Sequence, residues 1–299
     1  MALDPLAYYA SQGPISDPGK HAGLFEGLPT DIHELCEVVQ GLIIQPGWAQ
    51  VYGWTVAKEQ EDDLQLRHVA LMLDRILELD DRPLTVARPP ETRLGGNCRD
   101  HTMLLFLMLR HRGVPARARC GFGAYFLPGK YEDRWACEYW NGNKERWQLV
   151  DAQLNARQRE ILRIDFDTCD VPRARFVVAG MAWQMCRAGD ADSEAFGLTP
   201  LSEHGMWWVR QNLVRDMAAL NKMEMLPWDG WGLAQGLQNE VPQDAASLLD
   251  RVAGLTQDDQ AFAELRDTYE TKEMLRVPPT IRSNGPGGGR EVAIPAGVL

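Results

Sequence analysis

The sequence predicts an α+β fold, and three observations support this prediction. Apolar residues recur at spacings of three and four over residues 30–44 and 58–79, which is the period of amphipathic helices. From Ala116 the pattern changes to alternation, with Ala118, Cys120 and Phe122 separated by arginines and glycine, which indicates a strand ending near residue 126. Asn141-Gly142 then stands between two β-prone runs and predicts a hairpin. Helices combined with β-strands, two of them in an antiparallel hairpin, are therefore expected.

Residues 95–109 predict a buried helix with a cysteine in its first turn. Two glycines allow a sharp bend, Asn97 is a good N-cap, and Asp100 can complete a capping box. The apolar run 103–109 follows directly. Cys98 is thus expected where unpaired N–H groups and the positive end of the helix dipole meet, a position that favours a thiolate.

The rest of the chain is predicted from its turn and stop signals. The Cys98 helix is expected to end at Gly113, before Pro115. A hairpin tip at residues 142–143 would pair Arg134 with Asp151 across the two strands. After Asp151 the pattern favours mainly helices, over residues 172–187, 206–225, 244–253 and 257–275.

Composition excludes some functions. The formal net charge is −11, the isoelectric point is near 5.1, and there is no basic run, which argues against a nucleic-acid partner. No signal peptide or membrane-length apolar window is found, so a cytoplasmic location without a membrane partner is expected. The six cysteines are widely spaced without a Cys-x-x-Cys pair and are expected to be free thiols. We expect neither a metal nor a cofactor.

Four segments together resemble the bacterial transglutaminase-like superfamily: Gly-Asn-Cys-Arg-Asp at 96–100, Arg-His-Arg-Gly-Val-Pro-Ala-Arg-Ala-Arg-Cys-Gly at 110–121, Tyr-Glu-Asp-Arg-Trp at 131–135 and Leu-Val-Asp-Ala-Gln-Leu at 149–154. The resemblance implies a papain-like Cys-His-Asp core. It makes Cys98 the nucleophile and Asp151 the orienting carboxylate. Together with the Gly- and Pro-rich stretches at the two ends, it gives the expected organisation: an N-terminal arm and helix (1–57), the core (58–160), a helical region packed on the core (161–278) and a flexible tail (279–299).

One position departs from the family pattern, because Arg134 stands where the family has its histidine, just before Trp135. An arginine keeps its proton and cannot act as a general base. It would form a salt bridge with Asp151 or hold Cys98 as a thiolate by charge. His101, one turn after Cys98, is the candidate substitute base, with a packing role as the alternative.

Several residues have more than one interpretation. Cys98 is a nucleophile, a former nucleophile or a core thiol. Asn97 is a candidate second donor to an oxyanion besides the Cys98 N–H, although capping competes with this role. Aromatic and acidic residues line a substrate cleft or anchor a helix: Trp135, Trp228, Asp229 and Trp231.

The resemblance implies thiol acyl transfer, or amide or ester hydrolysis, through a Cys98 acyl-enzyme. The expected partner is a small-molecule or peptide acyl substrate, including a carrier-bound one. Bacterial relatives of this type include proteases, amidases and amide-forming enzymes of natural-product pathways. The alternative is a catalytically impaired or inactive member that acts as a binding or scaffold protein, because Arg134 replaces the expected histidine.

Overall fold

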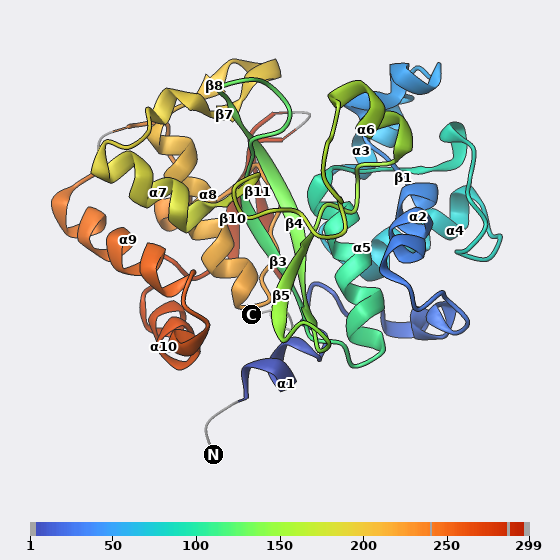
Figure 1. Ribbon diagram of the computed structural model, residues 1–299, viewed down its shortest axis with the longest axis horizontal. Coiled ribbons are helices and arrows are strands. Elements are labelled where there is room, and N and C mark those ends of the chain that lie inside the picture. The colour runs from blue at the N-terminus through green and yellow to red at the C-terminus, as the bar shows by residue number, and fades with distance from the viewer. Residues whose placement is uncertain (1–3, 240, 286–287, 296–299) are drawn as a thin grey trace. The chain divides into compact units, whose positions relative to one another are not determined.

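A computed structural model describes residues 4–239, 241–285 and 288–295 of the chain (Figure 1). It has the predicted α+β class and divides into two compact units. The Cys98 unit comprises residues 6–118 and 136–171, and the Asp216 unit comprises residues 1–5, 119–135 and 172–299. Among the described residues, no helix combines the length and apolar character needed to span a bilayer.

The Cys98 unit is built around one buried helix, α5 (Cys98–His111), against which α2 packs (Figure 1). The Asp31 carboxylate caps α2 by accepting from the N–H groups of His33 and Glu34. The other helices are α1 Pro5–Tyr9, η1 Gly19–Phe25, α2 Ile32–Leu42, η2 Pro46–Tyr52, α3 Lys58–Asp63, α4 Val69–Leu79, η3 Pro90–Thr92 and α6 Ala156–Leu162. Its strands are the parallel pair β1 Ile43–Ile44 and β2 Leu94–Gly95, the start of β3 Ala116–Gly123, and the end of β4 Tyr131–Asn141, which forms a hairpin with β5 Arg146–Val150.

The helix predicted over residues 58–79 is in fact two helices, α3 and α4, so this expectation is wrong. Arg75 on α4 donates to the carboxylate of Asp63 at the end of α3, with an Nε–Oδ1 distance of 2.9 Å. Residues twelve apart in one helix would be separated by about 18 Å. The chain folds back between them, and Val69 at the start of α4 donates its N–H to Ile15 O. The amphipathic pattern runs continuously through both helices, but the ion pair between Arg75 and Asp63 and the burial of apolar side chains favour a chain that folds back.

The hairpin forms as predicted, but its register is shifted by two residues. Val150 pairs with Cys137, and Arg146 pairs with Asn141. The expected pairing of Arg134 with Asp151 is therefore wrong. The turn contains four residues rather than two, and its last residue, Glu145, has a left-handed φ of 47°. Because the shift is even, every side chain keeps its predicted face of the strand.

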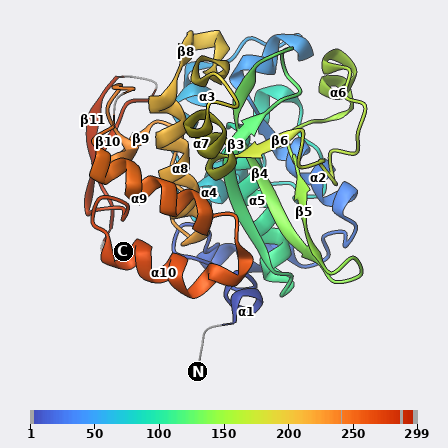
Figure 2. The same cartoon turned by 60° about the vertical axis from the view of Figure 1, so that its left-hand side comes forward.

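The Asp216 unit contains more strands than the sequence predicts. Its neighbouring strands follow the order β6-β3-β4-β7-β8, and a second sheet has the order β11-β10-β9. These strands are β6 Phe176–Val178, β7 Phe196–Leu198, β8 Glu203–His204, β9 Asp229–Gly230, β10 Thr280–Ser283 and β11 Arg290–Ala293. The helices are α7 Ala179–Ala188, η4 Ser193–Ala195, η5 Thr199–Leu201, α8 Met206–Leu220, η6 Gly232–Ala234, α9 Gln243–Leu255, η7 Asp259–Ala261 and α10 Phe262–Thr271, with α7, α8 and α9 packed together (Figure 2).

Two expectations for this unit are revised. The helix expected over residues 172–187 begins only at Ala179, because Phe176–Val178 pair with β3 instead. The sequence also predicts a flexible tail over residues 279–299, whereas its described part contains the antiparallel strands β10 and β11. Such short strands lack a detectable period, and their backbone pairing with distant segments decides their conformation.

A buried ion pair joins β3 to α8 in the Asp216 unit. Arg119 donates from Nε and from a terminal nitrogen to the two carboxylate oxygens of Asp216, at 3.0 and 2.9 Å. Arg119 also donates to Thr256 O, and Asp216 accepts the N–H of Cys120 at 2.8 Å. Both side chains are buried, so the bidentate geometry and the extra hydrogen bonds offset their desolvation.

Replacing one partner of this pair should destabilise the unit strongly. We expect Asp216→Ala to lower the free energy of unfolding by about 3–5 kcal/mol, because it leaves the Arg119 charge buried and unpaired. Denaturant unfolding measures the change. The matched control is Glu264→Ala, which breaks an exposed pair with Arg251 and should cost less than about 1 kcal/mol. Equal costs for the two variants would contradict the assigned role of Asp216.

Candidate active site

The first turn of α5 is fixed by the capping box that the sequence predicts. The Asn97 Oδ1 atom accepts the N–H of Arg99 at 2.8 Å, and the Asp100 carboxylate accepts the N–H of Asn97 at 2.9 Å. Asn97 itself has an extended backbone conformation, as an N-cap requires. Cys98 is therefore the first helical residue, and its backbone N–H lies in the first turn, where no carbonyl of the same helix can accept it.

Two glycines precede the cap, because other segments of the same chain lie too close to these two positions for a side chain to fit. A Cβ atom on Gly95 would lie 1.8 Å from the Gln60 carbonyl oxygen, and one on Gly96 would lie 2.6 Å from the Ile43 side chain. Neither glycine has a positive φ, so the predicted need for a sharp bend is not what selects them. Their role is to let the segment before Cys98 lie directly against α3 and β1.

Charged side chains beside Cys98 are buried and paired. Arg99 donates to Asp100 Oδ1 at 2.8 Å and to Arg67 O at 2.6 Å. Burial raises the pKa of Asp100, and the Arg99 charge opposes this shift. The pair ties the first turn of α5 to the segment before α4 and holds the backbone at Cys98 in place.

His101 lies one turn beyond Cys98 and has a defined orientation. Its Nδ1 atom is 2.8 Å from the Asn97 carbonyl oxygen, which can only accept a hydrogen bond. With Nδ1 as the donor, the proton acceptor of the neutral ring is Nε2. His101 also lines a small cavity together with Gln153, two residues after Asp151. This tautomer suits a general base, and Cys98, three residues earlier in the helix, is 7% exposed.

Asp151 follows β5 and is buried in the same unit. Its Oδ1 atom accepts the N–H of Gln153 at 3.2 Å, and its own N–H donates to Thr168 O at 2.8 Å. The hydrogen bond with Cys169 and burial are the main causes that raise the pKa of Cys36, and the negative charge of Asp151 adds to them. Asp151 thus organises the turn after β5, and its predicted catalytic role stays a prediction.

Arg134, which the sequence resemblance aligns with a histidine, belongs to the Asp216 unit. It is 3% exposed, and its guanidinium carbon lies 5.1 Å from the centre of the Phe126 ring. A guanidinium on an aromatic face is held by cation–π attraction. Since this group keeps its proton, it can supply charge but not general-base catalysis.

The predicted cleft residues also belong to the Asp216 unit, and they contribute to its interior. Trp135, Asp229 and Trp231 are buried, and Trp228 is half-buried. Trp231 donates from its indole nitrogen to Leu275 O at 2.9 Å, and Asp229 accepts the N–H of Leu226 at 3.1 Å. Anchoring the chain after α8 is therefore an observed role, and lining a substrate cleft stays a prediction.

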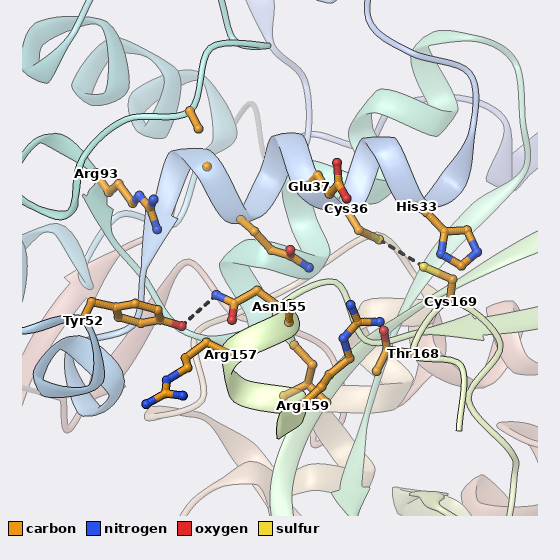
Figure 3. Close-up of a pocket in the computed structure, with 15 residues that line it drawn as sticks. His33, Cys36, Glu37, Tyr52, Arg93, Asn155, Arg157, Arg159, Thr168 and Cys169 are labelled. Atoms are coloured by element: carbon orange, nitrogen blue, oxygen red, sulfur yellow. Dashed lines mark hydrogen bonds between the residues drawn. The ribbon is translucent and has the colours of Figure 1, made fainter. Parts of the chain in front are cut away.

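The sequence does not predict a cavity of about 430 Å³ in the Cys98 unit, between α2 and the segment that contains α6 (Figure 3). Polar and charged side chains line it, including His33, Tyr52, Arg93, Asn155 and Arg159. A usable signal exists on α2, where His33, Glu37 and Gln40 recur at helical spacing and interrupt an otherwise apolar pattern. No pattern in the sequence predicts that α6 lies beside the same cavity.

Comparison with protein-family models, with curated proteins and with solved structures finds no match to this chain.

The position of Cys98 predicts faster alkylation than at Cys186. Burial, with a smaller effect from Asp192, raises the pKa of Cys186 to about 11, so little thiolate forms there near neutral pH. The helix start favours the thiolate of Cys98. We expect iodoacetamide to modify Cys98 at lower pH than Cys186, although Cys186 is the more exposed thiol. Peptide mass spectrometry across a pH series measures both rates. If Cys98 reacts no faster than Cys186, the helix start does not activate the Cys98 thiol.

Proposed function

We propose that this protein is a transglutaminase-like enzyme with a papain-like core, which transfers or hydrolyses acyl groups through a thioester on Cys98. The observation that supports this best is the first turn of α5. There a capped helix start presents Cys98, and the Asn97 amide nitrogen is buried without a hydrogen-bond partner among the described residues. A buried, unused donor on the residue next to the nucleophile supports a role in stabilising an oxyanion.

The proposed reaction begins with attack of the Cys98 sulfur on the acyl carbonyl carbon. A C–S bond forms as the carbonyl π electrons move to oxygen, which becomes an oxyanion. The Cys98 N–H and the Asn97 Nδ2 amide are the proposed donors to that oxygen. Since Asn97 caps the helix through Oδ1, capping and oxyanion binding use different atoms and do not compete.

Proton transfer is assigned to His101. Its Nε2 atom takes the thiol proton and returns it to the leaving amine or alcohol when the tetrahedral intermediate collapses to the thioester. Water or an amine then attacks the thioester, and the same nitrogen takes the proton of that nucleophile and returns it to the Cys98 sulfur. The proposed substrate is a small-molecule or peptide acyl group, free or carrier-bound. The net charge of −11 disfavours nucleic acid as its partner.

A second candidate function is binding without catalysis, and Arg134 favours it. This arginine occupies the family's histidine position and lies buried against Phe126. Under this alternative, the papain-like core is kept as a scaffold, and Cys98 is a former nucleophile. The two candidates differ in whether Cys98 accepts an acyl group.

Asn97 provides a test that separates oxyanion binding from helix capping. With an activated aryl ester such as p-nitrophenyl acetate, we expect an acetyl adduct on Cys98 that Cys98→Ser removes. Asn97→Ser keeps a good N-cap but lacks the amide donor. The acylation rate should therefore fall by about 10²–10³-fold, with unfolding little changed. Stopped-flow release of p-nitrophenol measures the rate, and an unchanged rate in a folded variant would rule out the Asn97 donor.

His101 and Arg134 can be compared in the same assay. His101→Ala should slow acylation by about 10²–10⁴-fold if the imidazole moves the proton. Arg134→His should raise turnover by restoring the family's base. If His101→Ala leaves the rate unchanged, His101 is not the base. If neither the original chain nor Arg134→His forms an adduct at Cys98, the non-catalytic candidate is favoured.

A further inference from the structure

We propose that the Cys98 unit contains a zinc site formed by His33, Cys36, Asp167 and Cys169; His33, Cys36 and Cys169 line one end of the cavity in Figure 3. The ligands come from two segments. His33 and Cys36 lie one turn apart on α2, whereas Asp167 and Cys169 flank Thr168 in the loop after α6. Because these segments are far apart in sequence, no spacing of the cysteines predicts the cluster. The site is separate from Cys98 and does not depend on the proposed acyl transfer.

Two ligand distances match tetrahedral zinc coordination, and Cys36 joins the group of His33, Asp167 and Cys169 through its contact with Cys169. Two sulfurs bound to Zn²⁺ at about 2.3 Å with a tetrahedral angle lie about 3.8 Å apart, and the Sγ atoms of Cys36 and Cys169 are 3.7 Å apart. A nitrogen and an oxygen on the same ion lie about 3.4 Å apart, and His33 Nε2 is 3.6 Å from Asp167 Oδ2. The ligand atoms of His33, Asp167 and Cys169 all lie within 4.8 Å of one another.

Hydrogen bonds hold both ligand segments in place. The Asp167 Oδ1 atom accepts the N–H of Cys169 at 2.8 Å, which directs the other carboxylate oxygen towards His33. The loop is fastened to the hairpin because Gln148 donates to Cys169 O at 2.8 Å and Asp151 donates its N–H to Thr168 O. On the other side, the Asp31 cap fixes the first turn of α2. Such support limits the reorganisation that metal binding requires.

The donor set selects zinc. Two thiolates, an imidazole and a carboxylate are all zinc ligands, and sulfur with nitrogen in a tetrahedral arrangement favours Zn²⁺ over Mg²⁺ or Ca²⁺, which prefer oxygen. A divalent cation would neutralise the two thiolates as it binds.

The cavity provides an entry path for the ion. His33, Cys36 and Cys169 line it, and Figure 3 shows their side chains grouped at one end, with the two sulfurs facing each other. His33 and Asp167 are about half exposed, whereas both sulfurs are buried. The ion would therefore enter past the imidazole and the carboxylate and be fixed by the thiolates beneath.

The test uses the full chain, reduced and freed of metal with a chelator. Titration with Zn²⁺ alone should give one ion per chain with a Kd below about 1 µM. Co²⁺ in its place should give the visible absorption of a tetrahedral ion and thiolate-to-metal charge-transfer bands. Cys36→Ser and Cys169→Ser should each remove the charge-transfer spectrum of a two-thiolate site. His33→Ala should weaken binding by more than about 10-fold.

Two matched control variants test whether thiols outside the cluster contribute to Zn²⁺ binding. Cys186→Ser and Cys98→Ser change thiols outside the cluster and should bind Zn²⁺ as the unmodified chain does. Stoichiometric binding that Cys36→Ser or Cys169→Ser leaves intact would overturn the proposal. A reduced chain that binds no Zn²⁺, with Cys36 and Cys169 forming only a disulfide on addition of hydrogen peroxide, would also overturn it. The Co²⁺ spectrum of the unmodified chain decides the matter even if a variant does not fold.

Discussion

Helix α5 has no exposed face over most of its length, and this constraint determines the arrangement of the Cys98 unit. Every residue from 98 to 110 is buried, so each polar group there requires a partner inside the protein. Arg99 pairs with Asp100, and Arg110 donates to Ala116 O at 2.7 Å, just beyond the end of the helix. These bonds fix both ends of α5 and therefore the position of Cys98. An ordinary solvent-exposed helix start would leave its first turn free to fray.

Because buried polar groups require partners, the side-chain amide nitrogen of Asn97, just before the first turn of α5, calls for an explanation. The Asn97 oxygen serves the cap, but its amide nitrogen is buried without a partner among the described residues. In the Asp216 unit, by contrast, both carboxylate oxygens of Asp216 are used, by Arg119 and by the N–H of Cys120. The hydrogen bonds that Asp216 makes with Arg119 and Cys120 thus serve to join α8 to β3. The unused donor of Asn97 remains to be explained, and a ligand oxygen would explain it.

How well the sequence predicts a feature depends on how local its cause is. The capping box at Asn97 and the stop at Gly113 involve neighbours in the chain, and both are found. The break before α4 depends on Arg75 reaching Asp63 across a fold of the chain, which no periodicity shows. The hairpin was predictable from Asn-Gly, but its register depends on a turn with a left-handed Glu145, which the sequence does not indicate. The strands of the Asp216 unit are short and are stabilised by pairing with distant segments.

Asp151 shows why tests of function here should centre on other residues. Its N–H supports the loop that carries Asp167 and Cys169, its carboxylate supports the turn after β5, and its charge acts on Cys36. A substitution there would disturb the fold, the cavity and any metal in it at once, so loss of activity would not identify a catalytic carboxylate. Asn97 lacks this ambiguity because its two side-chain atoms have separable roles. The more functions a buried carboxylate serves within the fold, the less its removal reveals about chemistry.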